Sequence, residues 1–133
     1  MNAWIGAVAV VGTLTGATNA WALSDYRCTV ERSVSASDSN FNQMYIGKQF
    51  TVERRTGLMA GALKNSYFTK PTVIDDGSTG NAFMVVTTMR ADQGVGAGSM
   101  VYVLTINEFT ESASKPFIYL INSDAYLGQC EHF

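Results

Sequence analysis

The sequence predicts an all-β fold: a single domain of about eight short antiparallel strands, arranged as an up-and-down barrel or a flattened barrel. Three observations predict this class. Extended stretches rich in Val, Ile, Thr and aromatic residues recur along the chain, clusters of Gly, Asn, Asp and Ser separate them, and no amphipathic helical pattern lies between them. A sheet that curls on itself also removes exposed strand edges. A two-sheet β-sandwich is the alternative architecture.

The first 24 residues form a compositional unit of their own, because the first charged side chain is Asp25. An apolar run over residues 5–11 leads into small polar residues, and Ala20-Trp21-Ala22 has the small-x-small pattern that signal peptidase accepts. We therefore predict a signal peptide over residues 1–22 and one domain over residues 23–133. An uncleaved anchor is the alternative, although the strongly apolar core is much shorter than the about 20 residues that cross a bilayer. We expect no stable membrane span after leader cleavage.

The charge balance and residue counts exclude several function classes. Nine Lys and Arg against eleven Asp and Glu leave a net charge of −2, so neither a basic nucleic-acid patch nor an acidic tail dominates. Two cysteines and one histidine are too few for a structural zinc cluster. Both tryptophans lie in the predicted leader, which makes the domain a weaker candidate for a sugar-binding lectin, although six tyrosines remain. We expect no cofactor, no metal and no nucleic-acid partner.

The two cysteines, Cys28 and Cys130, predict one disulfide in an exported protein, because an oxidising compartment favours pairing and only one connectivity exists. Such a bond closes a loop of about 100 residues and places the first and last segments of the domain side by side. A reactive thiol at Cys130, with His132 on the same face of an extended strand, is the alternative. No CxxC motif supports it.

The first half of the domain contains three predicted strand regions separated by turns. Phe50 and Val52 alternate with polar neighbours, which is the pattern of a half-buried strand, and Gly47 marks a bulge. Gly57 provides the positive φ of a short hairpin turn. The predicted extended stretches are residues 26–34, 41–46 with 49–54, and 58–63, and a polar loop spans residues 35–40.

The second half continues as a meander of strands and turns. The predicted strands are residues 71–75, 82–91, 100–109, 117–121 and 125–130. The turns between them are rich in Gly, Asn, Asp and Ser, and they span residues 75–81, 93–99 and 122–124.

Two of these strands are apolar on both faces, over residues 100–106 and 117–120. Since one face of each strand packs on the core, something must cover the other. The candidates are a loop over residues 65–70 or a short helix, a partner or second subunit, and a small-molecule cavity.

No residue pattern in the domain predicts catalysis. The turn over residues 75–81 lacks the alternating acids and distal Glu of an EF-hand. Arg54 and Arg55 adjoin a hairpin turn, where we expect a solvated tip, and His132 lies one residue from the end, where we expect a surface position. No glycine motif follows a strand and opens a helix, so a phosphate-binding loop is not predicted. The protein is therefore not expected to be an enzyme.

Two resemblances bear on the interpretation. In strand number and in its terminal Phe133 the chain is similar to bacterial outer-membrane barrels, but the alternate positions Gln129 and Glu131 are polar and the strand over residues 71–75 is too short for those barrels. In general shape the domain resembles the small periplasmic β-barrel inhibitors of lysozyme. Their Ser-Gly-x-x-Tyr type insertion loop is not found, so no residue roles are transferred.

The sequence thus leads to an expectation by elimination. We expect a periplasmic or secreted, non-catalytic binding protein of the bacterial envelope, of accessory or inhibitor type, acting through protein contact or self-association. The alternative is a small-molecule carrier with an internal barrel cavity. In either case Tyr102, Tyr119 and Tyr126 are the residues predicted to contact a ligand or partner.

Overall fold

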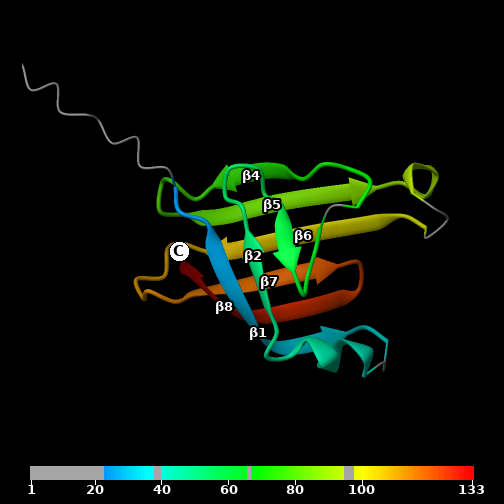
Figure 1. The fold of residues 1–133 in the computed structure, drawn as a ribbon, viewed down its shortest axis with the longest axis horizontal. Helices are drawn as coiled ribbons and strands as arrows, with labels where there is room; N and C mark the ends of the chain where they lie inside the picture. Colours follow the sequence, from blue (N-terminus) through cyan, green and yellow to red (C-terminus); the bar gives the residue numbers. More distant parts are fainter. Residues whose placement is uncertain (1–22, 38–39, 66, 95–97) are drawn as a thin grey trace, which may run out of the picture.

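The computed structural model describes residues 23–37, 40–65, 67–94 and 98–133, so the predicted signal peptide lies outside the described residues. The described chain forms one antiparallel sheet of eight strands curled into a half-barrel (Figure 1). The all-β prediction is confirmed, and the two-sheet sandwich is excluded because all eight strands belong to one hydrogen-bonded sheet. The elements are β1 (Tyr26–Ser35), η1 (Phe41–Tyr45), β2 (Gln49–Val52), β3 (Met59–Gly61), β4 (Thr72–Asp76), β5 (Ala82–Met89), η2 (Ala91–Gln93), β6 (Met100–Asn107), β7 (Lys115–Ile121) and β8 (Asp124–His132), where η denotes a 3₁₀ helix.

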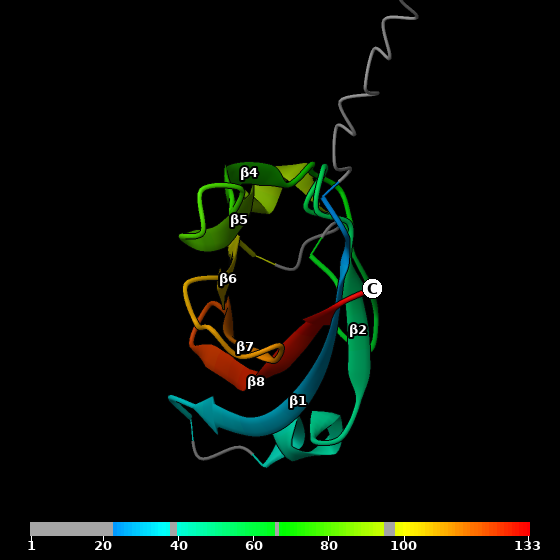
Figure 2. The ribbon, with the colours of Figure 1, turned by 90° about the vertical axis from the view of Figure 1, so that its left-hand side faces the viewer.

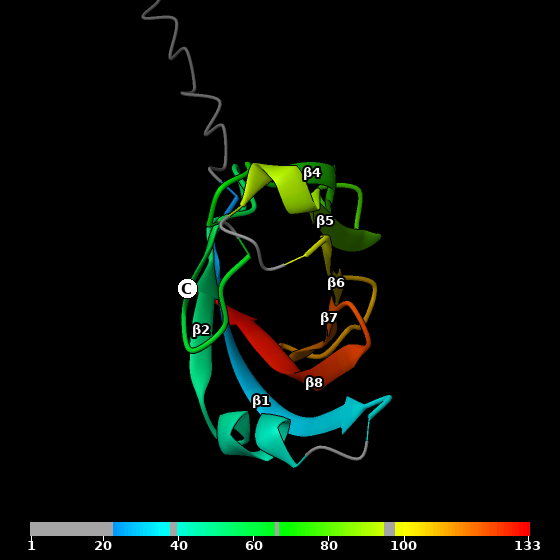
Figure 3. The ribbon, with the colours of Figure 1, turned by 90° about the vertical axis from the view of Figure 1, so that its right-hand side faces the viewer.

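The strand order places the chain ends at an interior position of the sheet. It runs β3-β2-β1-β8-β7-β6-β5-β4, so the first and last strands are neighbours and the two edges are β3 and β4. Figures 2 and 3 show the resulting curl, with β2 and the β4–β5 pair on opposite sides of the interior. The expectation that curling removes the strand edges was wrong, because β3 and β4 do not pair in the described structure.

Side chains and a turn close the seam between these two edges. Gly57, in the turn between β2 and β3, has φ +78°, and a Cβ there would lie 2.4 Å from Val85 Cγ2 on β5. Nearby, Arg54 Nε donates to the Asp76 carbonyl at 2.7 Å. The buried Asn65 side chain donates to the Gly57 carbonyl at 2.7 Å and accepts from the Met59 amide at 3.0 Å. The start of the 65–70 loop is therefore anchored at the seam and does not cover the outer surface of the sheet.

Local backbone bonding explains the main difference from the predicted strands. The stretch over residues 41–46 is mostly a 3₁₀ helix, in which Gln43 and Ile46 donate backbone hydrogen bonds three residues back, and it lies beside β1, where the Gln43 side chain donates to the Ser33 hydroxyl at 3.1 Å. Gly47 (φ +83°) lies in the turn that follows and marks no bulge. The bulges are between Val30 and Arg32 in β1 and between Val73 and Asp75 in β4. Four strands end two residues earlier than predicted, β2 at Val52, β3 at Gly61, β5 at Met89 and β6 at Asn107.

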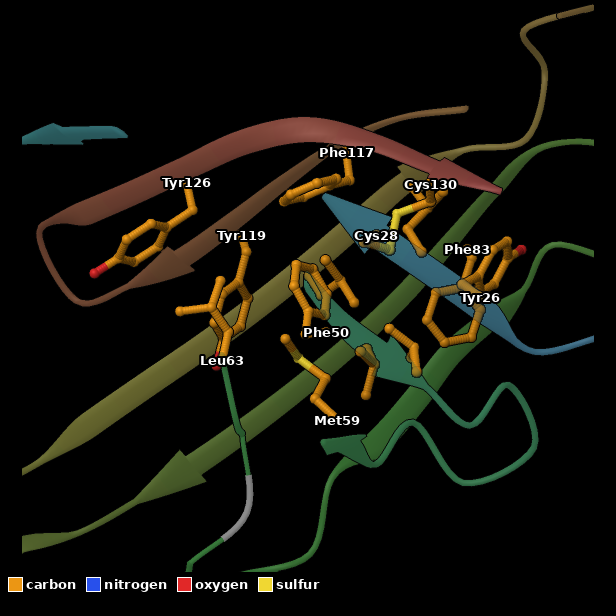
Figure 4. Packing of buried hydrophobic residues seen from close by; sticks show 14 of the residues in the cluster. Tyr26, Cys28, Phe50, Met59, Leu63, Phe83, Phe117, Tyr119, Tyr126 and Cys130 are labelled. Atoms are coloured by element: carbon orange, nitrogen blue, oxygen red, sulfur yellow. A yellow bond between two sulfur atoms is a disulfide. The ribbon is translucent and has the colours of Figure 1, made fainter. Parts of the chain in front are cut away.

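The concave side of the sheet is filled by alternate side chains of the strands. Phe50 lies within this core, where its ring meets Phe117 edge-on at 5.1 Å and Tyr119 at 6.4 Å (Figure 4). The core cluster comprises Tyr26, Cys28, Val30, Phe50, Val52, Met59, Leu63, Phe83, Val85, Tyr102, Leu104, Ile106, Phe117, Tyr119, Tyr126 and Cys130.

The predicted disulfide joins β1 to β8 (Figure 4). Cys28 and Cys130 lie directly opposite each other in the strand register, with their Cα atoms 4.0 Å apart. Because both sulfurs are bonded, the reactive thiol at Cys130 is excluded. Two residues before Cys130, Gly128 allows the strands to approach, since a Cβ there would lie 1.9 Å from the Thr29 carbonyl oxygen.

The disulfide indicates an oxidising, extracytoplasmic compartment. In the part of the chain that the structure describes, no helix has the length and apolar character needed to span a bilayer.

Candidate functional site

The three predicted contact residues come from adjacent strands and all point into the half-barrel. Tyr102 lies on β6, Tyr119 on β7 and Tyr126 on β8, and Tyr119 and Tyr126 are register partners. Tyr119 is fully buried, packs against Tyr126 with ring centroids 6.4 Å apart, and donates a 2.8 Å hydrogen bond to the Lys64 carbonyl. The space among the three rings is therefore largely packed, and any ligand contact would be at the open end of the strands.

At that end, Tyr102 and Tyr126 contribute to a surface pocket of about 190 Å³. We call it the tyrosine pocket. Its lining residues are Tyr45, Ala62, Leu63, Lys64, Tyr67, Met100, Tyr102, Ile121 and Tyr126. Tyr45 and Tyr67 were not predicted, because Tyr45 belongs to η1, which was predicted as a strand, and Tyr67 lies in a loop. The Tyr45 ring meets Tyr126 edge-on at 5.4 Å.

The tyrosine pocket has polar groups at its base. Tyr102 is 7% exposed and Tyr126 is 4% exposed, and neither hydroxyl has a hydrogen-bond partner among the described residues. Burial raises the pKa of both phenols, with Tyr67 adding to the shift at Tyr102 and Asp124 to that at Tyr126, whose pKa reaches about 12. Both side chains are therefore neutral hydroxyl groups at physiological pH.

A buried charged cluster occupies the opposite end of the half-barrel. Glu108, just after β6, has a side chain only 10% exposed, and it accepts a hydrogen bond from the Tyr26 hydroxyl. Its Oε1 lies 3.0 Å from His132 Nε2 and 3.7 Å from an Arg54 guanidinium nitrogen. The guanidinium carbon also lies 5.0 Å from the centre of the Tyr26 ring. We call these four residues the Glu108 cluster.

One sequence expectation was wrong at this cluster, that of a solvated Arg54, whereas His132 lies at the surface as expected, with its side chain 35% exposed. Arg54 is buried against Glu108 and Asp76, although its neighbour Arg55 is exposed as expected for a hairpin tip. His132 is held by Glu108 on one ring nitrogen, and its other nitrogen lies 3.0 Å from the Ser24 hydroxyl. Tyr26 lies at the start of β1 and His132 at the end of β8, while Arg54 follows β2 and Glu108 follows β6. Only the tertiary fold brings these four residues together.

The Glu108 cluster is a structural tie, by which we mean that its contacts hold the ends of β1, β2, β6 and β8 together. A phenol, an imidazole and a guanidinium all approach Oε1 of the Glu108 carboxylate. Burial and the bond to Glu108 raise the pKa of Tyr26 well above its usual range, which keeps the phenol a donor. A surface hollow of about 720 Å³ lies beside the cluster, lined by Leu23, Ser24, Asp25, Glu53, Arg54, Arg55, Asp76 and Phe133. Both acidic and basic side chains line it, so it selects neither sign of charge.

The acidic turn between β4 and β5 uses its carboxylates locally. Asp75 accepts from the Gly77 amide at 2.8 Å and Asp76 from the Ser78 amide at 2.9 Å, which are ordinary turn contacts. Among the described residues, no group of three or more His, Cys, Asp or Glu side chains is placed to hold a metal ion.

The convex side of the sheet carries the second apolar face predicted for two of the strands. One cross-strand row reads Val86, Val103, Leu120, Ala125 and Val34 from β5 to β1. Val101 is 46% exposed, and Ile118 and Leu120 are each 37% exposed, so no described element covers them. We call Met84, Val86, Val101, Val103, Ile118, Leu120, Ala125 and Leu127 the outer face.

Comparison with known proteins yields no relative. No protein-family model matches the chain, and no curated protein and no solved structure matches it either.

Proposed function

We propose that this protein is a non-catalytic binding protein of the bacterial envelope, periplasmic or secreted, which acts by docking its outer face into another protein. The observation that carries the proposal is the absence of charge across that face. The outward positions along β5 to β8 are Met84, Val86, Thr88, Val101, Val103, Thr105, Asn107, Pro116, Ile118, Leu120, Ala125, Leu127, Gln129 and Glu131, and the one charged residue among these, Glu131, lies at the end of β8, outside the outer face.

Charges begin only at the flanks of this surface. The cross-strand row through Ile118 ends at Asp75 on β4 and at Arg32 on β1, with Met84, Thr105, Ile118 and Leu127 between them. A central region without charge, bordered by charged residues, is the composition of a protein interface with its apolar centre and polar rim. An ordinary antiparallel sheet with one solvated face alternates apolar and polar residues instead.

The curvature of the sheet favours a particular kind of partner. Because the sheet curls into a half-barrel, the outer face is convex (Figure 2). Two convex surfaces touch only along a narrow line, so a second copy of this chain would bury little of it. A partner with a concave apolar groove would cover β6 and β7 together. This geometry supports an inhibitor or accessory role, in which the rigid wall of one protein fills a groove of another, over self-association.

The proposal predicts that a charge at the centre of the outer face abolishes partner binding without unfolding the protein. In Leu120→Lys the new ammonium would be buried unpaired in the complex, so binding should fall about 30-fold or more, the effect of losing a central contact. Stability should change by less than about 1 kcal/mol because Leu120 is partly exposed in the free protein. The matched control is Val34→Lys, which lies in the same cross-strand row on the β1 flank and should leave binding unchanged.

Photo-crosslinking identifies the partner for this test. A photoreactive phenylalanine analogue at position 120 should capture one envelope protein from the source bacterium, and the same analogue at the exposed Glu111 should not. The captured protein, once purified, is then measured against the Leu120→Lys and Val34→Lys variants. Equal binding by both variants, or capture at position 111 alone, contradicts the proposal. A homodimer crosslinked through position 120 would replace it with self-association.

A further inference from the structure

The tyrosine pocket has polar groups that the protein itself does not satisfy. Buried tyrosine hydroxyls ordinarily find a partner, as those of Tyr26 and Tyr119 do. The hydroxyls of Tyr102 and Tyr126 open on the pocket and have none among the described residues. Two largely buried tyrosines whose hydroxyls lack a protein partner in one pocket indicate a site that hydrogen-bonds to a group from outside.

The lining of the pocket selects the chemistry of that ligand. A hydroxyl group both donates and accepts hydrogen bonds, so its best match is a neutral group that does the same. Tyrosine rings pack against the flat apolar face of a ring. No carboxylate lines the pocket and Lys64 is its one charged lining residue, so a cationic ligand would meet no counter-charge.

The size of the pocket limits the ligand to one ring. Its volume of about 190 Å³ is below the range of about 300–1,000 Å³ typical of sites for drug-sized molecules. A polyproline peptide docks along an elongated aromatic groove with several subsites, which this pocket is too small to provide. A pyranose ring has both an apolar face and hydroxyl groups that donate and accept. It therefore meets each requirement.

We propose that the tyrosine pocket binds a single neutral pyranose unit of a saccharide. The hydroxyls of Tyr102 and Tyr126 hydrogen-bond to the sugar, and the rings of Tyr45 and Tyr67 contact its apolar face. The pocket lies at the end of the half-barrel and shares no residue with the outer face, so this site is independent of the protein partner proposed above.

The proposal is tested by NMR titration of the isotope-labelled full-length protein with methyl β-glucopyranoside and, separately, N-acetylglucosamine. At least one sugar should shift the resonances of Tyr45, Tyr102 and Tyr126 with a Kd of about 1–10 mM. Tyr102→Phe and Tyr126→Phe should each weaken binding about tenfold, the effect of one hydrogen bond, while the fold is kept because neither hydroxyl has a partner in the protein.

Tyr26→Phe is the matched control, because it removes a buried tyrosine hydroxyl at the opposite end and should leave sugar binding unchanged. The proposal is overturned if neither sugar shifts the pocket resonances at about 100 mM, well above a millimolar Kd. It is also overturned if binding survives both Tyr→Phe changes, or if a polyproline peptide shifts the same resonances and the sugars do not. If neither sugar shifts these resonances, the hydroxyls of Tyr102 and Tyr126 hydrogen-bond to water only.

Discussion

Loss of the Cys28–Cys130 disulfide is expected to lower the free energy of unfolding by about 3–5 kcal/mol. The bond joins residues separated by 102 positions, and the chain-entropy model gives about 4.7 kcal/mol for a loop of about 100 residues. Small domains are stable by only about 5–15 kcal/mol, so this one bond represents a large share. Chemical denaturation followed by far-ultraviolet circular dichroism measures the change.

The position of the bond in the sheet adds to its importance. The pairing of β1 with β8 is the one strand pairing that connects β1–β3 to β4–β8 in the described sheet, and the disulfide lies within it. We expect the Cys28→Ala/Cys130→Ala variant to unfold at much lower denaturant concentration. The reduced wild-type protein is the matched control, because it loses the bond without leaving the void of a smaller side chain. If the reduced protein is within about 1 kcal/mol of the oxidised one, the entropic account fails here.

Truncation of Glu108 to alanine is expected to destabilise the protein by about 3–5 kcal/mol, as for other buried ion pairs that lose one partner. The side chains of Glu108 and Arg54 are 10% and 6% exposed. Without the carboxylate, the Tyr26 hydroxyl loses its acceptor and the Arg54 guanidinium is left buried beside one carbonyl. The tie between the ends of β1, β2, β6 and β8 would then be lost.

Glu131→Ala is the matched control for this prediction. Glu131 also pairs with an arginine, Arg27, at 2.7 Å, but these side chains are 55% and 44% exposed. Exposed pairs contribute about 0–1 kcal/mol because water and salt screen them. Denaturant unfolding of the two variants should therefore separate them by at least about 2 kcal/mol. Similar losses in both would mean that burial does not determine the effect and that Glu108 is not the centre of a tie.

The two ends of the half-barrel differ in whether the protein supplies a hydrogen-bond acceptor for the buried tyrosine hydroxyls. At the Glu108 end, the Tyr26 hydroxyl has a carboxylate acceptor. At the other end, Tyr102 and Tyr126 have no acceptor among the described residues. This contrast separates a stabilising cluster from a candidate binding site, although both contain buried phenols with raised pKa values.

Much of the fold was predictable because its signals are local. Alternation at Phe50 and Val52, the positive φ of Gly57 and the turn at residues 122–124 depend on a few neighbouring residues, and they were predicted correctly. The disulfide was predictable because two cysteines allow one pairing. Residues 41–46 were mispredicted, because their residue types suit an extended strand but their backbone bonds within the segment as a 3₁₀ helix instead of pairing with the neighbouring β1.

By itself, the sequence determined the strand periodicity, the turns, the disulfide and the apolar character of both faces of β6 and β7. Each of these depends on the order of residues along a short stretch or on a residue count. Only the tertiary structure decided that Arg54, Glu108 and His132 meet, that Tyr45 and Tyr67 join the predicted tyrosines, and that the strand edges fall at β3 and β4. Such contacts join residues far apart in the chain, and their formation depends on the register and curvature of the whole sheet, which no local pattern encodes.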